Sequence, residues 1–111
     1  AAARGKAVFT GAGQCAQCHS GSTFTDANMR LHAPSEVVSE PEPGGAPSYA
    51  SRSATKMYRT APLRGVWQHP PYFHNGIAPN LESVVDLYNA RNSLGLSTQQ
   101  KADLVQYLKS L

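Results

Sequence analysis

The sequence predicts an all-α fold of three or four short helices joined by long irregular loops. Two stretches near the C-terminus carry apolar residues at helical spacing, and a short apolar stretch near the N-terminus leads into a pair of cysteines. Between them lies a long segment that is rich in proline and glycine and shows little periodicity. The helices are therefore expected at the two ends of the sequence, with irregular chain between them.

The first predicted helix covers residues 3–13. Ala7, Val8 and Phe9 supply its apolar face, and two glycines loosen its C-terminal end. The helix leads directly into the two cysteines, so whatever these cysteines bind lies next to its end.

The segment Cys15-Ala16-Gln17-Cys18-His19 has the C-x-x-C-H pattern at which a c-type haem is attached. Two thiols three positions apart on one helical turn can each form a bond to a haem vinyl group. The adjacent histidine can then donate a ring nitrogen to the iron. We therefore predict one covalent haem c, bound through Cys15 and Cys18, with His19 as the proximal iron ligand.

Other uses of a cysteine pair are less well supported. A C-x-x-C pair also occurs in thioredoxin-like redox proteins and in half of a zinc site. The first use requires a βαβ pattern around the pair, which the sequence lacks, and the second requires two further ligands at close spacing. The histidines do not provide that spacing, and no third cysteine is present.

The middle of the sequence is predicted to be irregular. Prolines and glycines interrupt residues 20–56, so we expect a long loop that is ordered where it contacts the haem and mobile around residues 39–48. Residues 57–79 are dense in aromatic residues and prolines. That composition suits a segment folded over one face of a flat ligand.

Two further helices are predicted in the C-terminal third. In residues 80–91, apolar side chains follow at helical spacing from Leu81 to Tyr88, and Asn80 can cap the N-terminus. The last helix begins with Ser97-Thr98-Gln99-Gln100, which has the S-x-x-Q form of a capping box. Its buried face is expected to consist of Leu104, Val105, Leu108 and Leu111.

Length and composition limit the classes of protein that remain. A chain of 111 residues predicts a single monohaem domain, residues 1–111. Its hydrophobic fraction of 41% is low for a self-sufficient core, so we expect the haem to complete the packing. No run of 18 or more apolar residues predicts a membrane span. A net charge of +3 is too weak to argue for nucleic-acid binding.

The cofactor also suggests a location and a kind of partner. The sequence begins Ala1-Ala2-Ala3 with no signal peptide, as expected of a mature product or an excised domain. Because covalent haem attachment usually takes place outside the cytoplasm, we expect a periplasmic or exported protein. Arg52, Lys56, Arg59 and Arg64 cluster in one stretch. They form a solvated face, partners for the haem propionates, or a docking face for an acidic redox protein.

The order of these elements resembles the electron-transfer haem domain of the bacterial dihaem cytochrome c peroxidases and MauG-like proteins. The resemblance runs over about residues 6–111. It is carried by the C-x-x-C-H motif, by Phe24-Thr25-Asp26 with His32, by R-T-A-P-L-R-G-V at 59–66, by P-Y-F-H-N-G at 71–76, and by the stretch from Leu81 to Tyr88.

That resemblance implies the small all-helical cytochrome c fold, in which Phe9 is expected to contact the C-terminal helix where the two helices cross. Members of that family carry two haem motifs and this sequence has one, so the haem domain at which peroxide reacts is missing. The resemblance therefore implies the electron-carrying half of the family architecture.

The ligand on the second face of the haem decides between a carrier and a catalyst. Met57 is the favoured ligand because its soft thioether suits iron, although it can equally be an ordinary gap-filling side chain. The resemblance offers Tyr88, 14 residues after His74, where the family has methionine or tyrosine. Tyr88 also fits the apolar stripe of its helix. The remaining alternatives are Met29, His32, His69, His74 and an open site.

Four other residues are expected to bind the cofactor without ligating the iron. By the same resemblance, Arg64 is a propionate partner, and His74 hydrogen-bonds a propionate or the backbone near the haem. Tyr72 and Trp67 belong to the aromatic segment, and we expect Trp67 to pack against the porphyrin rather than to relay electrons.

The first functional hypothesis is a monohaem c-type cytochrome, not an enzyme, that carries single electrons between periplasmic redox partners. It follows from the covalent motif, the single haem and the lack of a catalytic constellation. One alternative is a small peroxidase-like haem enzyme. Another is an excised electron-transfer domain of a larger dehydrogenase or multihaem protein. We expect a monomer or a weak oligomer.

Overall fold

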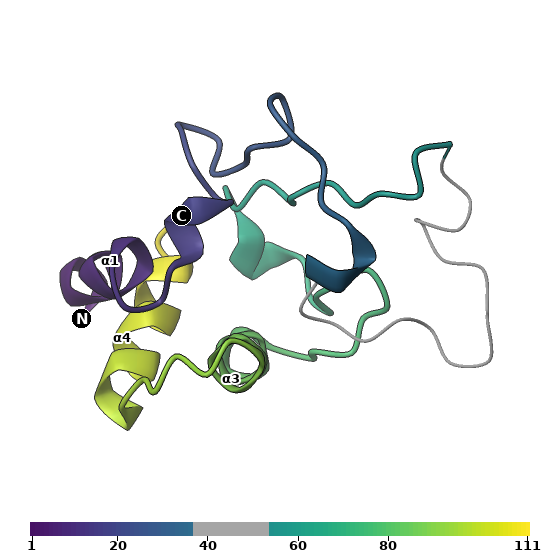
Figure 1. Ribbon diagram of the computed structural model, residues 1–111. Coiled ribbons are helices and arrows are strands. Elements are labelled where there is room, and N and C mark those ends of the chain that lie inside the picture. The colour runs from purple at the N-terminus through teal and green to yellow at the C-terminus, as the bar shows by residue number, and fades with distance from the viewer. Residues whose placement is uncertain (37–53) are drawn as a thin grey trace.

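The computed structural model describes residues 1–36 and 54–111. Three α-helices pack at one end of the molecule: α1 (Ala2–Thr10), α3 (Leu81–Arg91) and α4 (Thr98–Leu108). The rest of the described chain forms irregular segments and three single-turn 3-10 helices, Cys15–Gln17, Pro34–Glu36 and Val66–Gln68. Figure 1 shows α1 lying against α4, with α3 beside α4 and the irregular chain extending to the other side. The predicted all-α fold with long loops is confirmed.

The crossing of α1 and α4 is the main contact between helices. A Cβ atom at Gly5 would overlap the backbone carbonyl of Asp103, so only glycine allows the two helices to approach this closely. Phe9 is 2% exposed, and its ring lies edge-on to Tyr107 with 5.3 Å between the ring centroids. The expected contact of Phe9 with the C-terminal helix is therefore confirmed.

An ion pair fastens the same crossing at its edge. The guanidinium group of Arg4 donates two hydrogen bonds to the carboxylate of Asp103, at 2.7 and 2.8 Å. Gln99 donates a third at 3.1 Å. The carboxylate is buried while Arg4 stays largely exposed, so solvent screening limits how much the pair adds to stability.

The predicted starts of the C-terminal helices are confirmed. The side chain of Asn80 accepts a hydrogen bond from the backbone N–H of Ser83, which caps α3. Ser97 and Gln100 form the reciprocal capping box at the start of α4. The first helix is shorter than predicted, because the chain leaves α1 at Gly11 and turns toward the cysteines.

The buried core lies between these three helices and extends into the irregular chain. Its buried members are Val8, Phe9, Leu81, Val85, Leu96, Leu104, Val105 and Leu108. Leu111, predicted to be buried, is only partly covered. The core therefore consists of the apolar stripes that the sequence predicts, with contributions from all three helices.

Two short antiparallel contacts organise the irregular chain. His32 pairs with Tyr58 through reciprocal backbone hydrogen bonds, and Tyr72 pairs in the same way with Ala78. These isolated bridges do not extend into a strand anywhere in residues 1–36 or 54–111. The segment predicted to be mobile, residues 39–48, and the predicted cation Arg52 lie outside the described residues.

The lengths of the helices bear on the membrane prediction. The longest described helices have 11 residues. None of the helices in the described part of the chain is long and apolar enough to cross a membrane.

Candidate haem site

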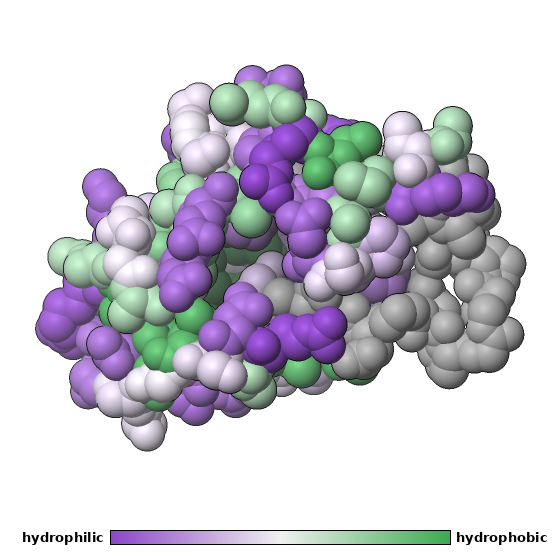
Figure 2. Space-filling view, in the orientation of Figure 1, coloured by the Kyte–Doolittle hydropathy of each residue, from purple (hydrophilic) through white to green (hydrophobic). Residues whose placement is uncertain are grey.

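A cavity of about 600 Å³ lies between the cysteine motif and α3. This volume falls within the usual range for a cofactor site. Figure 2 shows a hollow on this face of the molecule, between hydrophilic side chains and with hydrophobic residues visible inside it. One wall comes from residues 13–19 and the other from α3 and the aromatic segment, and α4 contributes Leu104 and Leu108.

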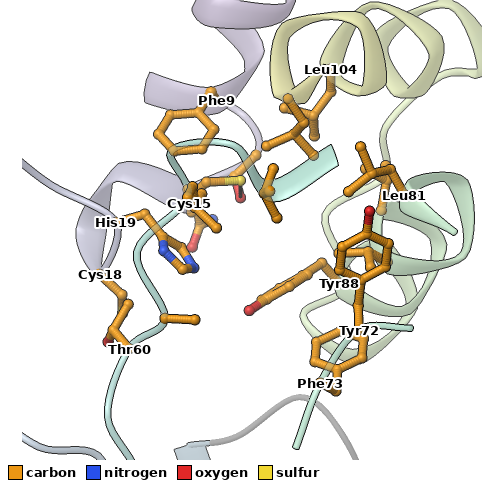
Figure 3. A pocket seen from close by; sticks show the side chains of 18 of the residues that line it. Phe9, Cys15, Cys18, His19, Thr60, Tyr72, Phe73, Leu81, Tyr88 and Leu104 are labelled. Atoms are coloured by element: carbon orange, nitrogen blue, oxygen red, sulfur yellow. Dashed lines mark hydrogen bonds between the residues drawn. The ribbon is translucent and has the colours of Figure 1, made fainter. Parts of the chain in front are cut away.

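The C-x-x-C-H motif forms a tight turn at the edge of this cavity. Residues Cys15–Gln17 make one 3-10 turn, and the backbone N–H groups of Cys18 and His19 both bond to the carbonyl of Cys15. This turn brings Cys15, Cys18 and His19 to the same wall, and all three line the cavity. Figure 3 shows the His19 ring pointing into the open space.

The two cysteines are free, half-buried thiols. Burial raises the pKa of Cys15 to about 11 and also raises the pKa of Cys18 above its usual value. A thioredoxin-like redox pair needs the opposite, because the reactive form is the thiolate. The electrostatics of the site therefore disfavour a dithiol–disulfide role for this pair.

The imidazole of His19 is oriented by a backbone carbonyl. Its Nδ1 lies 3.1 Å from the carbonyl oxygen of Phe24, so the N–H is placed to donate there and Nε2 is left for the cavity. Burial lowers the pKa of His19, and hydrogen bonds to the backbone of Phe24 and Ala61 only partly oppose this shift. Both effects favour a neutral imidazole with a free lone pair, which is the form that binds a metal.

Tyr88 enters the cavity from the opposite wall. Figure 3 shows its side chain reaching from α3 into the space that His19 faces. Its ring contacts Phe73, with centroids 5.8 Å apart. Burial raises the pKa of Tyr88 to about 12, so the phenol of the protein alone is protonated at neutral pH.

The other predicted iron ligands are placed less favourably. Met57 is half-buried, and it is not among the described residues that line the cavity. Met29 is 82% exposed on the surface. His32 lines the cavity but is buried, with Nε2 2.9 Å from Asp26 and Nδ1 facing Arg30 and Glu36.

The aromatic segment covers part of the same cavity. His69, Tyr72, Phe73 and His74 all line it, and both histidines are exposed at its rim. The ring of His74 lies 4.9 Å from that of Tyr58. Trp67 is 51% exposed and lines a separate pocket of about 410 Å³, which shares Tyr72 and Leu81 with the main cavity.

Two arginines, Arg59 and Arg64, line the rim of the cavity. Arg64 donates from Nε to the carbonyl of Ser22 at 2.7 Å, and its guanidinium lies 5.7 Å from the centre of the Phe24 ring. Its side chain therefore links the 60–65 segment to the loop that follows the motif.

Several site residues are not marked by the sequence pattern. The acceptor of the His19 hydrogen bond is a main-chain oxygen, and any residue type can supply one. The backbone of Phe24 has a φ of 56°, a left-handed conformation that its sequence does not announce. The aliphatic lining from Val84 and Val85 could be found only as part of the ordinary apolar stripe of α3.

The residues present fit a covalent haem. The cavity combines two thiols on one turn, a neutral imidazole aimed inward, an apolar lining and cations at the rim. This donor set matches attachment through cysteines, axial ligation by nitrogen and pairing with carboxylates. Fold and site together define a cytochrome c-like domain.

Comparison with known proteins gives the same class. A family model described as RoxA-like, cytochrome c-like matches residues 57–94. MauG, a methylamine utilization protein of Methylorubrum extorquens, is 34% identical over 99% of this chain and 34% of its own length. The cytochrome-c peroxidase IdrP2 of Denitromonas iodatirespirans is 30% identical over 96% of this chain and 38% of its own length.

A solved structure supports the fold. The crystal structure of a MauG-like protein associated with microbial copper homeostasis superposes with a TM-score of 0.69. It is 23% identical, and the match covers 98% of this chain and 46% of that chain. The predicted resemblance to the dihaem cytochrome c peroxidase and MauG family is thus confirmed, and the chain spans about a third to two fifths of the length of its curated relatives.

These names correct one prediction. We expected a protein that is not an enzyme, but the curated relatives are MauG and proteins named as cytochrome-c peroxidases. The expectation rested on the lack of a catalytic constellation in the sequence. That criterion fails for haem proteins, because the cofactor carries the reactive centre and the protein needs only a few residues around it.

Proposed function

We propose that this chain is a monohaem electron-transfer domain that works within a MauG-like or peroxidase-type enzyme. The observation that carries the proposal is the cavity into which the C-x-x-C-H turn directs both thiols and the imidazole of His19. Its similarity to about a third of MauG supports the assignment to one domain of a larger architecture.

The residues that would hold the haem follow from their positions. Cys15 and Cys18 would form the thioether bonds, and His19 would bind the iron through Nε2. Arg64 and His74 lie at the rim, where the haem carboxylates need cations and hydrogen-bond donors. When bound, the haem supplies one-electron chemistry at iron.

On the distal side, the lining of the cavity supports Tyr88 as the group that faces the iron. Tyr88 extends into the space opposite His19, and Met57 does not line it. A phenol in this position resists ionisation in the protein alone, and a nearby ferric iron would oppose that effect of burial. Ligation by Met57 remains a prediction that requires a different placement of its segment.

The chain's own residues serve electron transfer by restricting change around the cofactor. Apolar side chains such as Val84, Val85 and Leu104 line the cavity and would keep water away from a bound haem. The hydrogen bond to Phe24 holds the imidazole of His19 in one orientation. A site that does not reorganise when its charge changes is suited to moving single electrons.

The proposed setting is the periplasm, where covalent haem proteins are assembled. Arg59 and Arg64 are exposed at the rim of the cavity and add positive charge there. This charge supports docking of a redox partner with an acidic face. Salt should then slow the electron exchange, because it screens the attraction between exposed charges.

A second candidate function is reaction with peroxide at this site itself. The observation in its favour is that no methionine among the described residues lines the cavity, so the distal side of a bound haem would depend on the weaker ligand Tyr88. Rapid peroxide consumption by the isolated haem-loaded domain would support it. Consumption only when a second haem domain is present would assign the chemistry elsewhere and leave the electron-transfer role to this chain.

The main experiment is expression of the chain together with a haem-attachment system. We expect a coloured protein whose haem stays bound after denaturation and whose spectrum changes reversibly on reduction. Cys15→Ala and Cys18→Ala together should leave no covalent haem, whereas Met29→Ala at the exposed surface should retain it. A colourless wild-type product, or bound zinc in place of haem, would refute the proposal.

A further inference from the structure

We infer that Arg64 and the Thr25–Thr60 hydrogen bond act as a clamp that positions the Phe24 carbonyl for the proximal imidazole. This inference rests on the proposed haem function. It assigns to Arg64 a positioning role that differs from pairing with a propionate. It also gives Thr25 and Thr60 a function in tuning the iron.

The loop held by this clamp carries a hydrogen-bond acceptor for the imidazole of His19. Nδ1 of the imidazole lies 3.1 Å from the carbonyl oxygen of Phe24. Phe24 adopts a left-handed backbone conformation, with φ at 56°, which a phenylalanine rarely adopts unless its surroundings impose it. Without outside contacts the peptide would relax, and its carbonyl would turn away from the ring.

One side of the clamp acts just before Phe24. Arg64 donates from Nε to the carbonyl of Ser22 at 2.7 Å. The same guanidinium lies 5.7 Å from the centre of the Phe24 ring, where a cation interacts favourably with the aromatic face. Arg64 thus fixes both the backbone two residues before the acceptor and the acceptor's own side chain.

The other side of the clamp acts just after Phe24. The hydroxyl of Thr25 donates to the carbonyl of Thr60 at 2.6 Å and accepts from the backbone N–H of Ala27 at 3.1 Å. Thr60 is buried, so water does not compete well for its carbonyl. The two contacts stand on either side of Phe24, and both come from the single segment 60–64.

The segment 60–64 is well suited to be the rigid part of the clamp. It contains Pro62, whose ring restricts the backbone, and its carbonyl at residue 63 accepts the first hydrogen bond of the Val66–Gln68 turn. Residues 60–64 also line the cavity wall. Displacement of this wall would therefore be transmitted to the imidazole through the loop.

The consequence for the iron has a definite sign. A hydrogen bond from Nδ1–H to a carbonyl raises the basicity of an axial imidazole. A more basic ligand favours ferric iron, so loosening the clamp should favour ferrous iron and increase the reduced fraction at a fixed solution potential. Removal of a cation near the haem acts in the opposite direction, because it destabilises the extra electron.

Thr25 offers the cleanest test, because its substitution changes no charge. In the haem-loaded protein, Thr25→Val should raise the ratio of reduced to oxidised iron about two- to tenfold at fixed potential. This range is expected when the hydrogen bond from Nδ1 of His19 to the carbonyl of Phe24 is lost. The Nδ1 proton of His19, followed by NMR in the reduced protein, should exchange with solvent faster. Thr25→Ser retains the hydroxyl and should match the wild type in both measurements.

A comparison of Arg64 with Arg59, the second arginine at the rim, distinguishes the clamp from an effect of charge alone. Arg59→Gln should lower the reduced fraction and leave exchange of the Nδ1 proton unchanged. Arg64→Gln should accelerate that exchange and give a higher reduced fraction than Arg59→Gln. Equal unfolding temperatures among the variants would show that the fold persists. A decrease in unfolding temperature smaller than the decrease caused by Phe9→Ala would show the same.

The outcomes distinguish this inference from the proposed function. Wild-type protein without covalent haem would refute the proposed function before the variants are measured. Haem-loaded Thr25→Val that behaves as the wild type in both measurements would refute the clamp. The clamp would also be refuted if Arg64→Gln gave the same reduced fraction and the same exchange of the Nδ1 proton as Arg59→Gln. Arg64 would then act only through its charge.

Discussion

At the scale of single residues, burial determines which chemistry the cavity can support. Cys15 and Tyr88 face the same space, and burial raises the pKa of both. His19 is shifted in the other direction, toward the neutral ring. All three groups are therefore uncharged at neutral pH before any cofactor enters. Such a site favours a large apolar ligand that supplies its own charge at the centre.

The distal ligand gives the first prediction. Tyr88→Phe keeps the ring that packs against Phe73 and removes only the hydroxyl that projects into the cavity. We expect the ferric visible spectrum of the haem-loaded protein to change, because the substitution would remove the oxygen that we propose as the distal ligand. Met57→Leu is the matched control and should leave the spectrum as it is. A spectral change in Met57→Leu alone would restore Met57 as the ligand.

The residue scale also shows how far sequence reasoning extends. Cys15, Cys18 and His19 were predicted as one unit because a contiguous motif places them on a single turn, and the structure brings them to the same wall. The distal side could not be predicted in this way. Tyr88 reaches the cavity only because α3 packs opposite the motif, and that contact depends on the whole fold.

At the scale of elements, the close crossing of α1 and α4 depends on a glycine, which has no side chain. Gly5 lies against the backbone of Asp103, and Phe9 fills the space beside it. The apolar stripe of α4 and the Phe9 contact were predictable from spacing. The role of Gly5 was not, because a glycine inside a helix usually signals only a local loss of stability.

Gly5→Ala tests this crossing. Helix propensity alone would make the alanine variant more stable by about 1 kcal/mol. Overlap of the new Cβ with the Asp103 carbonyl should outweigh that gain and destabilise the protein by about 1–3 kcal/mol. Chemical denaturation measures the sign. Ala7→Gly, at an exposed position of the same helix, is the control and should cost about 1 kcal/mol. Increased stability of Gly5→Ala would refute the close approach.

The ion pair at this crossing predicts sensitivity to acid. The hydrogen bond from Arg4 holds the pKa of Asp103 below its ordinary value. A lowered pKa in the folded state contributes stability above the unfolded pKa, about 4, and this contribution is lost as the pH falls through the folded value. Asp103→Asn should therefore be less stable than the wild type at pH 7. In thermal unfolding, the difference between the two should shrink as the pH falls below the unfolded pKa of about 4. A difference that stays constant with pH would contradict the linkage.

At the scale of the whole molecule, the apolar side chains are divided between a buried cluster and the lining of an open cavity. The buried cluster lies where α1, α3 and α4 meet, and the cavity of about 600 Å³ opens beside it. Irregular chain forms much of the remaining wall. The overall class followed from the sequence because α3 and α4 carry clear caps and apolar stripes. The paths of the loops did not, because they depend on isolated bridges such as His32 with Tyr58.

Loss of the cofactor should accordingly affect packing throughout the molecule. We expect the Cys15→Ala, Cys18→Ala double variant to unfold at lower temperature than the haem-loaded wild type and to bind a hydrophobic dye. Its near-ultraviolet circular dichroism should weaken more than the far-ultraviolet signal, as in states that keep helices but lose fixed packing. The haem-loaded single variant Met29→Ala controls for substitution at the surface. A fully cooperative transition in the double variant would contradict this expectation.

The pairing of α1 with α4 also bears on how the molecule matures. Arg4 and Asp103 stand 99 positions apart, so their contact forms only after the intervening residues have been made. Cys15 and Cys18 emerge long before α3 and α4, which supply the far wall. A tetrapyrrole can therefore be joined to an extended chain, and the late helices close over it afterwards. In this order of assembly, the haem would be in place before the far wall of its cavity forms.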